Sequence, residues 1–123
     1  MRVKGLNWMG VETTALGEMT RLFTEVMGLQ VARDQPNCVA FRLPDGDELE
    51  IFGAGGSHPP EQFASNKVEA GLLVDDIEQA STELAAAGLR LIGERQYGEG
   101  GFAWQHFQAP DGKVFQLAYD PHR

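Results

Sequence analysis

The segment PDGKVFQLAY, residues 110–119, repeats the plan of an earlier segment, PDGDELEIF, residues 44–52. In both segments proline fixes a backbone angle, aspartate can hydrogen-bond its own backbone, and glycine accepts a positive φ, so a tight turn is expected. The residues that follow alternate between apolar and polar side chains, which predicts a strand. A turn and strand at the same place in two halves of one chain indicates an internal repeat.

Each half also contains a predicted helix ahead of this turn. Apolar residues recur at helical spacing in the first half: Met19, Leu22, Phe23, Val26 and Met27. This spacing predicts one apolar helix face over residues 17–27, with Gly28 as a left-handed cap. In the second half, Asp75 or Asp76 can cap a helix that starts at Ile77.

The predicted strands complete two equivalent sets. They are residues 3–12, 30–34, 38–43 and 48–52 in the first half, and residues 70–74, 90–96, 102–108 and 114–119 in the second. The order strand, helix, strand, strand, strand therefore occurs twice and predicts an α+β fold. We expect a single domain, residues 1–123, made of two βαβββ modules, residues 1–56 and 68–123. Residues 53–67 are rich in Gly, Pro and Ser, and residues 57–67 within them are the predicted linker.

The composition excludes several classes of partner. The chain has 123 residues, a net charge of −8 and a pI near 4.7. Such a surface repels phosphate backbones and anionic lipids, so we expect no nucleic-acid or membrane partner. No apolar run approaches the roughly 18 residues of a membrane span. Cys38 is the sole cysteine, which rules out an internal disulfide and favours a cytoplasmic location.

Strand alternation places two polar side chains on corresponding faces of the two halves. Leu49 and Ile51 form the apolar side of their strand, so Glu50 points to the opposite face. By the same argument Gln116, between two apolar residues, faces away from the apolar side of the last strand. If the halves are related by pseudo-symmetry, Glu50 and Gln116 lie at equivalent depths on one concave face. The alternative is that Glu50 marks the solvent side of a half-buried sheet.

Aromatic and basic residues suggest a binding surface. Trp104 and His106 are two positions apart in one strand and share a face. Trp8, Phe52 and Trp104 together would form walls for a planar or apolar molecule, although isolated aromatic residues more often belong to a core. Arg42 could meet an anionic group at the rim of such a surface, or end its strand in solvent.

These residues carry a family resemblance. The strand and helix that end at Met27-Gly28, the Val74-Asp75-Asp76-Ile77 junction and both PDG strands resemble the vicinal oxygen chelate superfamily. That superfamily includes glyoxalase I, bleomycin-resistance proteins and extradiol dioxygenases. The resemblance implies curved, mostly antiparallel sheets around a ligand-binding cup, with His106 pointing into it, and often a homodimer. There His106 could move a proton or bond a ligand carbonyl, or simply bond a neighbouring strand.

The resemblance also implies four positions for metal ligands. They fall early in each first strand, at Trp8 and Glu69, and in each last strand, at Glu50 and Gln116. Oxygen donors at Glu50, Glu69 and Gln116 suit one divalent ion such as Mg²⁺, Mn²⁺, Ni²⁺ or Fe²⁺. The lack of histidine at these positions lowers the expected affinity for zinc or iron, and Trp8 removes a ligand and fills volume. A cup without metal is the equal alternative.

Two functions follow from the resemblance. In one, the cup binds a small organic molecule without catalysis, as drug-sequestering bleomycin-resistance proteins do. In the other, the protein is a divalent-metal-dependent, glyoxalase-like lyase or isomerase in which Glu69 or His106 moves a proton. The orientation of the Trp8 ring separates these hypotheses, because a ring that points into the cup leaves the metal site incomplete.

Overall fold

The computed structural model describes residues 1–55 and 66–123. The first half contains β1 (Val3–Thr13), α1 (Leu16–Arg21), the π-helical turn η1 (Leu22–Val26), β2 (Gln30–Gln35), β3 (Cys38–Arg42) and β4 (Glu48–Gly53). The second half contains β5 (Val68–Val74), α2 (Ile77–Ala86), β6 (Arg90–Tyr97), the short 3-10 turn η2 (Glu99–Gly101), β7 (Ala103–Gln108) and β8 (Val114–Tyr119). The predicted order of elements is confirmed, and the predicted linker lies almost entirely outside the described residues.

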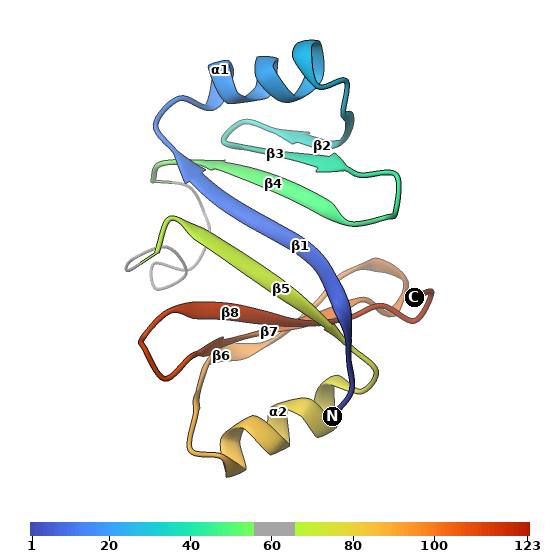
Figure 1. Cartoon of the computed structure of the whole chain (residues 1–123), viewed down its shortest axis with the longest axis vertical. Coiled ribbons are helices and arrows are strands. Elements are labelled where there is room, and N and C mark those ends of the chain that lie inside the picture. The colour runs from blue at the N-terminus through green and yellow to red at the C-terminus, as the bar shows by residue number, and fades with distance from the viewer. Residues whose placement is uncertain (56–65) are drawn as a thin grey trace.

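The described strands form one sheet, and the order of strands is the same in both halves when counted outward from the centre. The eight strands follow the order β2-β3-β4-β1-β5-β8-β7-β6, with the first strand of each half at the centre (Figure 1). β1 and β5 are antiparallel to each other, whereas β1 with β4 and β5 with β8 are parallel pairs. The sheet is mixed, as expected for an α+β fold, and the two halves meet where β1 pairs with β5.

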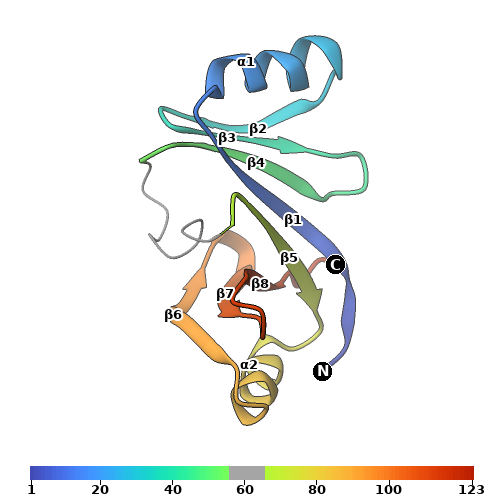
Figure 2. The same ribbon diagram turned by 60° about the vertical axis from the view of Figure 1, so that its left-hand side comes forward.

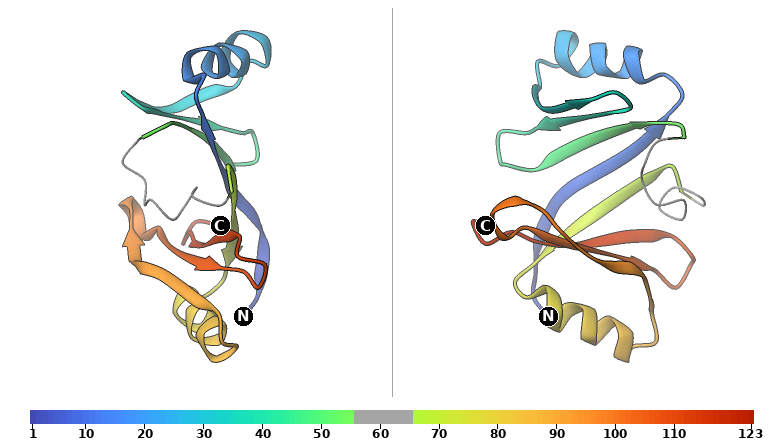
Figure 3. Two further views of the ribbon diagram at one scale, coloured as in Figure 1. Left: turned by 90° about the vertical axis from the view of Figure 1, so that its left-hand side faces the viewer. Right: turned by 180° about the vertical axis from the view of Figure 1, so that it is seen from behind.

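Each half has its own hydrophobic core under its own helix. The first core is formed by Val39, Phe41, Leu49 and Ile51, and the second by Val74, Ile77, Ala80, Ala103, Phe107 and Leu117. α1 covers the first core at one end of the molecule and α2 covers the second at the other (Figure 1, Figure 3). The helices therefore occupy the outer side of the sheet and leave its other face for the cup.

The first helix differs from its prediction. Met19 and Phe23 pack against the core as expected, but Leu22, Val26 and Met27 are 40%, 77% and 57% exposed. The chain leaves the α-helical path at Leu22 and continues as a π-helix. Because a π-helix has more residues per turn, the last two apolar positions rotate away from the face that Met19 and Phe23 define. The left-handed cap is confirmed, with Gly28 at φ 69°.

The two PDG turns have the same structure. Gly46 and Gly112 have φ of 93° and 90°, a conformation that favours glycine. The side chains of Asp45 and Asp111 each accept a hydrogen bond from the backbone N–H two residues later, at 2.9 and 3.1 Å. The repeat inferred from the sequence is therefore present in the backbone and in its hydrogen bonds.

The sheet is curved, and its two outer parts lie on the same side of β1 and β5 (Figure 2). This curvature produces a concave face between the halves, to which the residues of the candidate site belong. In the part of the chain that the structure describes, no helix is long and apolar enough to cross a membrane.

Candidate functional site

The concave face holds a cleft of about 1290 Å³ between the two halves of the sheet. Seven predicted site residues line it: Trp8, Arg42, Glu50, Phe52, Trp104, His106 and Gln116. Glu69, the eighth, is only 1% exposed and lies beneath this lining. The cleft brings together residues from both halves, as pseudo-symmetry predicts, while their individual roles stay predictions.

The ring of Trp8 lies at the centre of this face, over Gly10. A Cβ atom at position 10 would stand 2.4 Å from Cη2 and 2.5 Å from Cζ2 of the indole. In the sheet register, Gly10 pairs with Glu50 on β4 and with Glu69 on β5. The indole therefore fills the space between the two glutamates, and a glycine at position 10 is what allows it.

Glu50 is held by donors from three strands. The indole Nε1 of Trp8 donates to its Oε1 at 2.9 Å, and the Cys38 thiol donates to its Oε2 at 3.1 Å. The Arg33 guanidinium lies 3.6 Å from the same Oε2. Burial, together with the negative charge of Glu50, raises the pKa of Cys38 to about 12. The thiol therefore stays protonated at neutral pH and serves as a donor.

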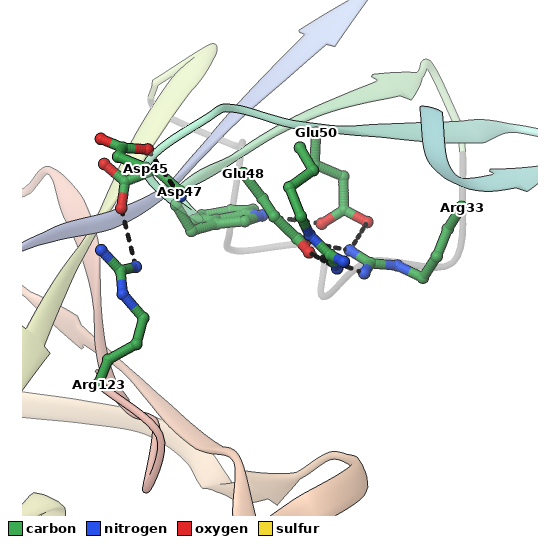
Figure 4. Close-up of polar contacts among 8 residues, drawn as sticks. Arg33, Asp45, Asp47, Glu48, Glu50 and Arg123 are labelled. Atoms are coloured by element: carbon green, nitrogen blue, oxygen red, sulfur yellow. Dashed lines mark hydrogen bonds and ion pairs between the residues drawn. The ribbon is translucent and has the colours of Figure 1, made fainter. Parts of the chain in front are cut away.

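A neighbouring carboxylate, Glu48, is bound by two arginines, Arg33, which Figure 4 labels, and Arg42. Arg33 donates to its two oxygens at 2.6 and 3.2 Å, and Arg42 donates at 2.9 Å. Burial alone would raise the pKa of Glu48, but the hydrogen bonds from both guanidinium groups outweigh it and hold the pKa below its usual value. Glu48 is therefore charged at neutral pH and neutralises part of the arginine charge at this wall of the cleft.

The second half contributes a buried histidine–glutamate pair. His106 Nδ1 lies 2.7 Å from Oε1 of Glu69, and the two side chains are 7% and 0% exposed. A carboxylate at Nδ1 favours the tautomer with the proton on that nitrogen and fixes the ring. Since His106 lines the cleft and Glu69 lies behind it, Nε2 is the ring nitrogen left for a ligand.

The donor set does not fit one metal ion shared by the predicted ligands. Glu50 is engaged by Trp8 and Cys38, Glu69 is engaged by His106, and the indole ring lies between the two carboxylates. Among the described residues, no group of three or more His, Cys, Asp or Glu side chains is arranged to hold a metal. The metal set Glu50, Glu69 and Gln116 stays a prediction that direct metal analysis can test.

Sequence reasoning missed two features of the cleft. Arg33 comes from an edge strand whose side chains showed no pattern, and its partner Glu48 lies on the same face of β4 as Glu50. Asn7 also lines the cleft although it directly precedes Trp8. Strict alternation would send Asn7 to the other face. A register shift between Leu6 and Trp8 changes this, and the sequence contained no signal for it.

Comparison with known proteins identifies the family of the chain. The family model of the Glyoxalase/Bleomycin resistance protein/Dioxygenase superfamily matches residues 5–117. The chain belongs to this superfamily. This confirms the resemblance drawn from the PDG strands and the strand-to-helix junctions. A search of curated proteins found no match.

Solved structures share the superfamily fold. A superfamily member from Vibrio splendidus is 22% identical with a TM-score of 0.67, covering 94% of this chain and 99% of that one. Methylmalonyl-CoA epimerase from Mycobacterium tuberculosis is 15% identical with a TM-score of 0.74, covering 98% and 91%. The Mn(II)-bound glyoxalase from Novosphingobium aromaticivorans is 19% identical with a TM-score of 0.78, covering 97% of this chain but 40% of that one. At these identities the likeness shows the fold alone.

Proposed function

We propose that this superfamily member binds a small, planar organic molecule in the cleft without the help of a metal ion. The observation that carries the proposal is the position of the Trp8 ring, which fills the space between Glu50 and Glu69 and donates a hydrogen bond to Glu50. The place that a metal ion would share between these carboxylates is taken by an aromatic side chain, and the same ring becomes part of the wall of the cleft.

Aromatic pairs from both halves support a planar ligand. Trp8 packs edge-on against Phe52 with ring centroids 6.4 Å apart, and Phe102 packs against Trp104 at 5.6 Å. All four rings line the same cleft, one pair from each half of the sheet. Aromatic faces contribute large apolar contact areas and fix the plane of a bound ring.

The charges favour a neutral or cationic ligand over an anionic one. Arg33 and Arg42 are both paired with Glu48, and Arg33 also lies 3.6 Å from Glu50, so two carboxylates offset the two guanidinium charges. The net charge of −8 attracts cations to the protein as a whole. Sequestration of a cationic planar compound, without chemistry, fits both facts. The predicted homodimer and the cytoplasmic location stay predictions, and size-exclusion chromatography with light scattering would test the former.

Metal content tests this proposal directly. We expect gently purified wild-type protein to hold no stoichiometric Ni, Mn, Zn or Fe by elemental analysis, even after metal is added back. Trp8→His should gain nickel binding, because it removes the ring and supplies a ligand beside Glu50 and Glu69. Trp104→His, in the same cleft, is the control and should not. Stoichiometric metal in the wild type that is lost in Glu69→Ala would instead favour the metal-dependent lyase or isomerase.

Ligand binding tests the other half of the proposal. Acridine orange, a planar cation, should bind the wild type in a fluorescence anisotropy titration and bind Trp8→Ala and Trp104→Ala at least about tenfold more weakly, because each change removes an aromatic contact. Equal affinity for all three proteins, or no binding to any, would contradict a planar-ligand cleft.

A second candidate is metal-free proton transfer by His106 and Glu69. The 2.7 Å contact between Nδ1 and Oε1 in a buried site is the arrangement expected of an oriented general base. Because solved neighbours include methylmalonyl-CoA epimerases, deuterium uptake at the α-carbon of methylmalonyl-CoA in D₂O is the reaction to assay first. Uptake in the wild type that His106→Gln abolishes would favour this candidate. Absence of uptake would favour binding without chemistry.

A further inference from the structure

Asn7 faces the cleft because of an irregularity in the central strand. β1 pairs with β5 at Leu6–Leu72 and at Trp8–Gly71, so β1 carries one extra residue between these pairs. Such a bulge turns a side chain that would otherwise point to the opposite face, and bulges are common beside functional sites. Asn7 and Trp8, although consecutive, therefore both line the cleft.

The amide oxygens of Asn7 and Gln116 converge over Gly71. A Cβ atom on Gly71 would stand 2.8 Å from Asn7 Oδ1 and 3.2 Å from Gln116 Oε1. Both amides are 6% exposed, and they come from different halves of the molecule, on β1 and β8. A glycine at position 71 is thus what allows two carbonyl oxygens to approach one point of the cleft floor.

One of these oxygens lacks a partner among the residues that the structure describes. Among the described residues, Asn7 Oδ1 is buried and accepts no hydrogen bond. A buried acceptor without a donor destabilises the folded state, because its hydration is lost and nothing replaces it. A bulge that brings an amide to the cleft and then leaves its oxygen unpaired is difficult to explain by folding alone.

We propose that Asn7 and Gln116 form a polar subsite that accepts hydrogen bonds from an N–H group on the planar ligand. This inference rests on the proposed function, since Trp8 adjoins the subsite and supplies the ring against which the ligand stacks. The Cβ of Trp8 is 3.3 Å from the place that a Cβ on Gly71 would occupy. The two amide oxygens therefore lie next to the base of the Trp8 side chain. An amino group on the edge of a stacked ring can then reach both oxygens.

A matched pair of dyes tests the subsite. Proflavine and acridine orange are planar cations with the same ring system, but the exocyclic amines of proflavine carry N–H groups and those of acridine orange are methylated. We expect the wild type to prefer proflavine by about tenfold, the effect of two ordinary hydrogen bonds. Asn7→Leu and Gln116→Leu should each lose most of this preference. Gln79→Leu, on the outer helix α2, should keep it.

Thermal unfolding supplies an independent readout. Leucine has nearly the shape of asparagine and no polar group, so Asn7→Leu should raise the Tm by several degrees if Oδ1 is unpaired in the free protein. A lower Tm, with the preference retained, would show that the amide serves folding and would overturn the proposal.

The outcomes separate this inference from the function on which it rests. Equal binding of both dyes to the wild type would reject the subsite and leave the planar-ligand function standing. No binding of either dye would reject the planar-ligand function, and it would also reject the ligand proposed for the subsite. A preference for proflavine that both leucine variants lose would support the two together.

Discussion

The two halves of the molecule each contribute one glutamate to the site, Glu50 on β4 and Glu69 on β5, and place these carboxylates in opposite surroundings. In the first half, Glu50 lies at the surface of the cleft, with its side chain 17% exposed, and accepts hydrogen bonds from an indole and a thiol. In the second half, Glu69 is completely buried and holds His106. The backbone plan is the same, but one carboxylate belongs to the binding surface and the other lies behind it.

The difference shows what a duplicated fold leaves free to vary. Strand order, turn geometry and the position of each helix repeat closely between the halves. The side chains on the concave face do not, because no core depends on their shape. Polar groups there can be exchanged for rings, as at Trp8, provided that a small residue such as Gly10 makes room. The comparison predicts that Glu50 and Glu69 contribute unequally to the free energy of unfolding.

The largest difference should appear when each glutamate is removed. Glu69→Ala should lower the free energy of unfolding by about 3 kcal/mol, because His106 loses a buried, charge-assisted hydrogen bond that water cannot replace. Glu50→Ala should cost about 1 kcal/mol, since water can reach the donors that it leaves. Urea denaturation at neutral pH measures both. Glu69→Gln, which retains an acceptor, should fall between them, and equal losses for the two alanine variants would contradict the comparison.

A glycine-to-alanine pair compares the aromatic walls. Gly10→Ala should displace the Trp8 ring, break its bond to Glu50 and cost about 1–3 kcal/mol through overpacking. Gly98→Ala is the control beside the other wall, where a Cβ would meet Phe102 and Trp104 at ordinary contact distances of 3.4 and 3.5 Å. Tryptophan fluorescence should shift to longer wavelength in the first variant only. A shift in neither would mean that the indole does not depend on the space over Gly10.

The fold was predictable from the sequence because its signals are local. Both PDG turns, Gly28 and the apolar alternation of β4 act within a few residues, and all four predicted roles hold in the structure. The exception is the end of the first helix, where Val26 and Met27 kept helical spacing in the sequence but left the core when the chain adopted a π-helical turn.

The site was only partly predictable, because it depends on contacts between distant strands. Alternation was enough to place Glu50 and Gln116 on the concave face. It could not show that His106 would meet Glu69, since that contact depends on how β5, β8 and β7 align. Nor could it place Asn7, because a bulge alters the alternation on which the reasoning depends.

The smallest expected effect concerns Glu48, which has no charged counterpart in the second half, where Val114 stands in the corresponding place. Because Arg33 and Arg42 hold its pKa below the usual value in the folded protein, Glu48 binds its proton more readily when unfolded. It therefore contributes stability above its unfolded pKa of about 4.3, and this is lost as pH falls through the folded pKa. The contribution should stay below about 1 kcal/mol, because both arginines are partly exposed.

Urea denaturation of wild type and Glu48→Gln from about pH 7 to about pH 3 tests this contribution. The wild type should be the more stable protein at neutral pH, and the difference should shrink below about pH 4 as its carboxylate becomes protonated. A difference that stays constant over the whole range would mean that the arginine clamp does not act through the charge of Glu48. The clamp would then shape the wall of the cleft through packing alone, as the aromatic rings of the same cleft do.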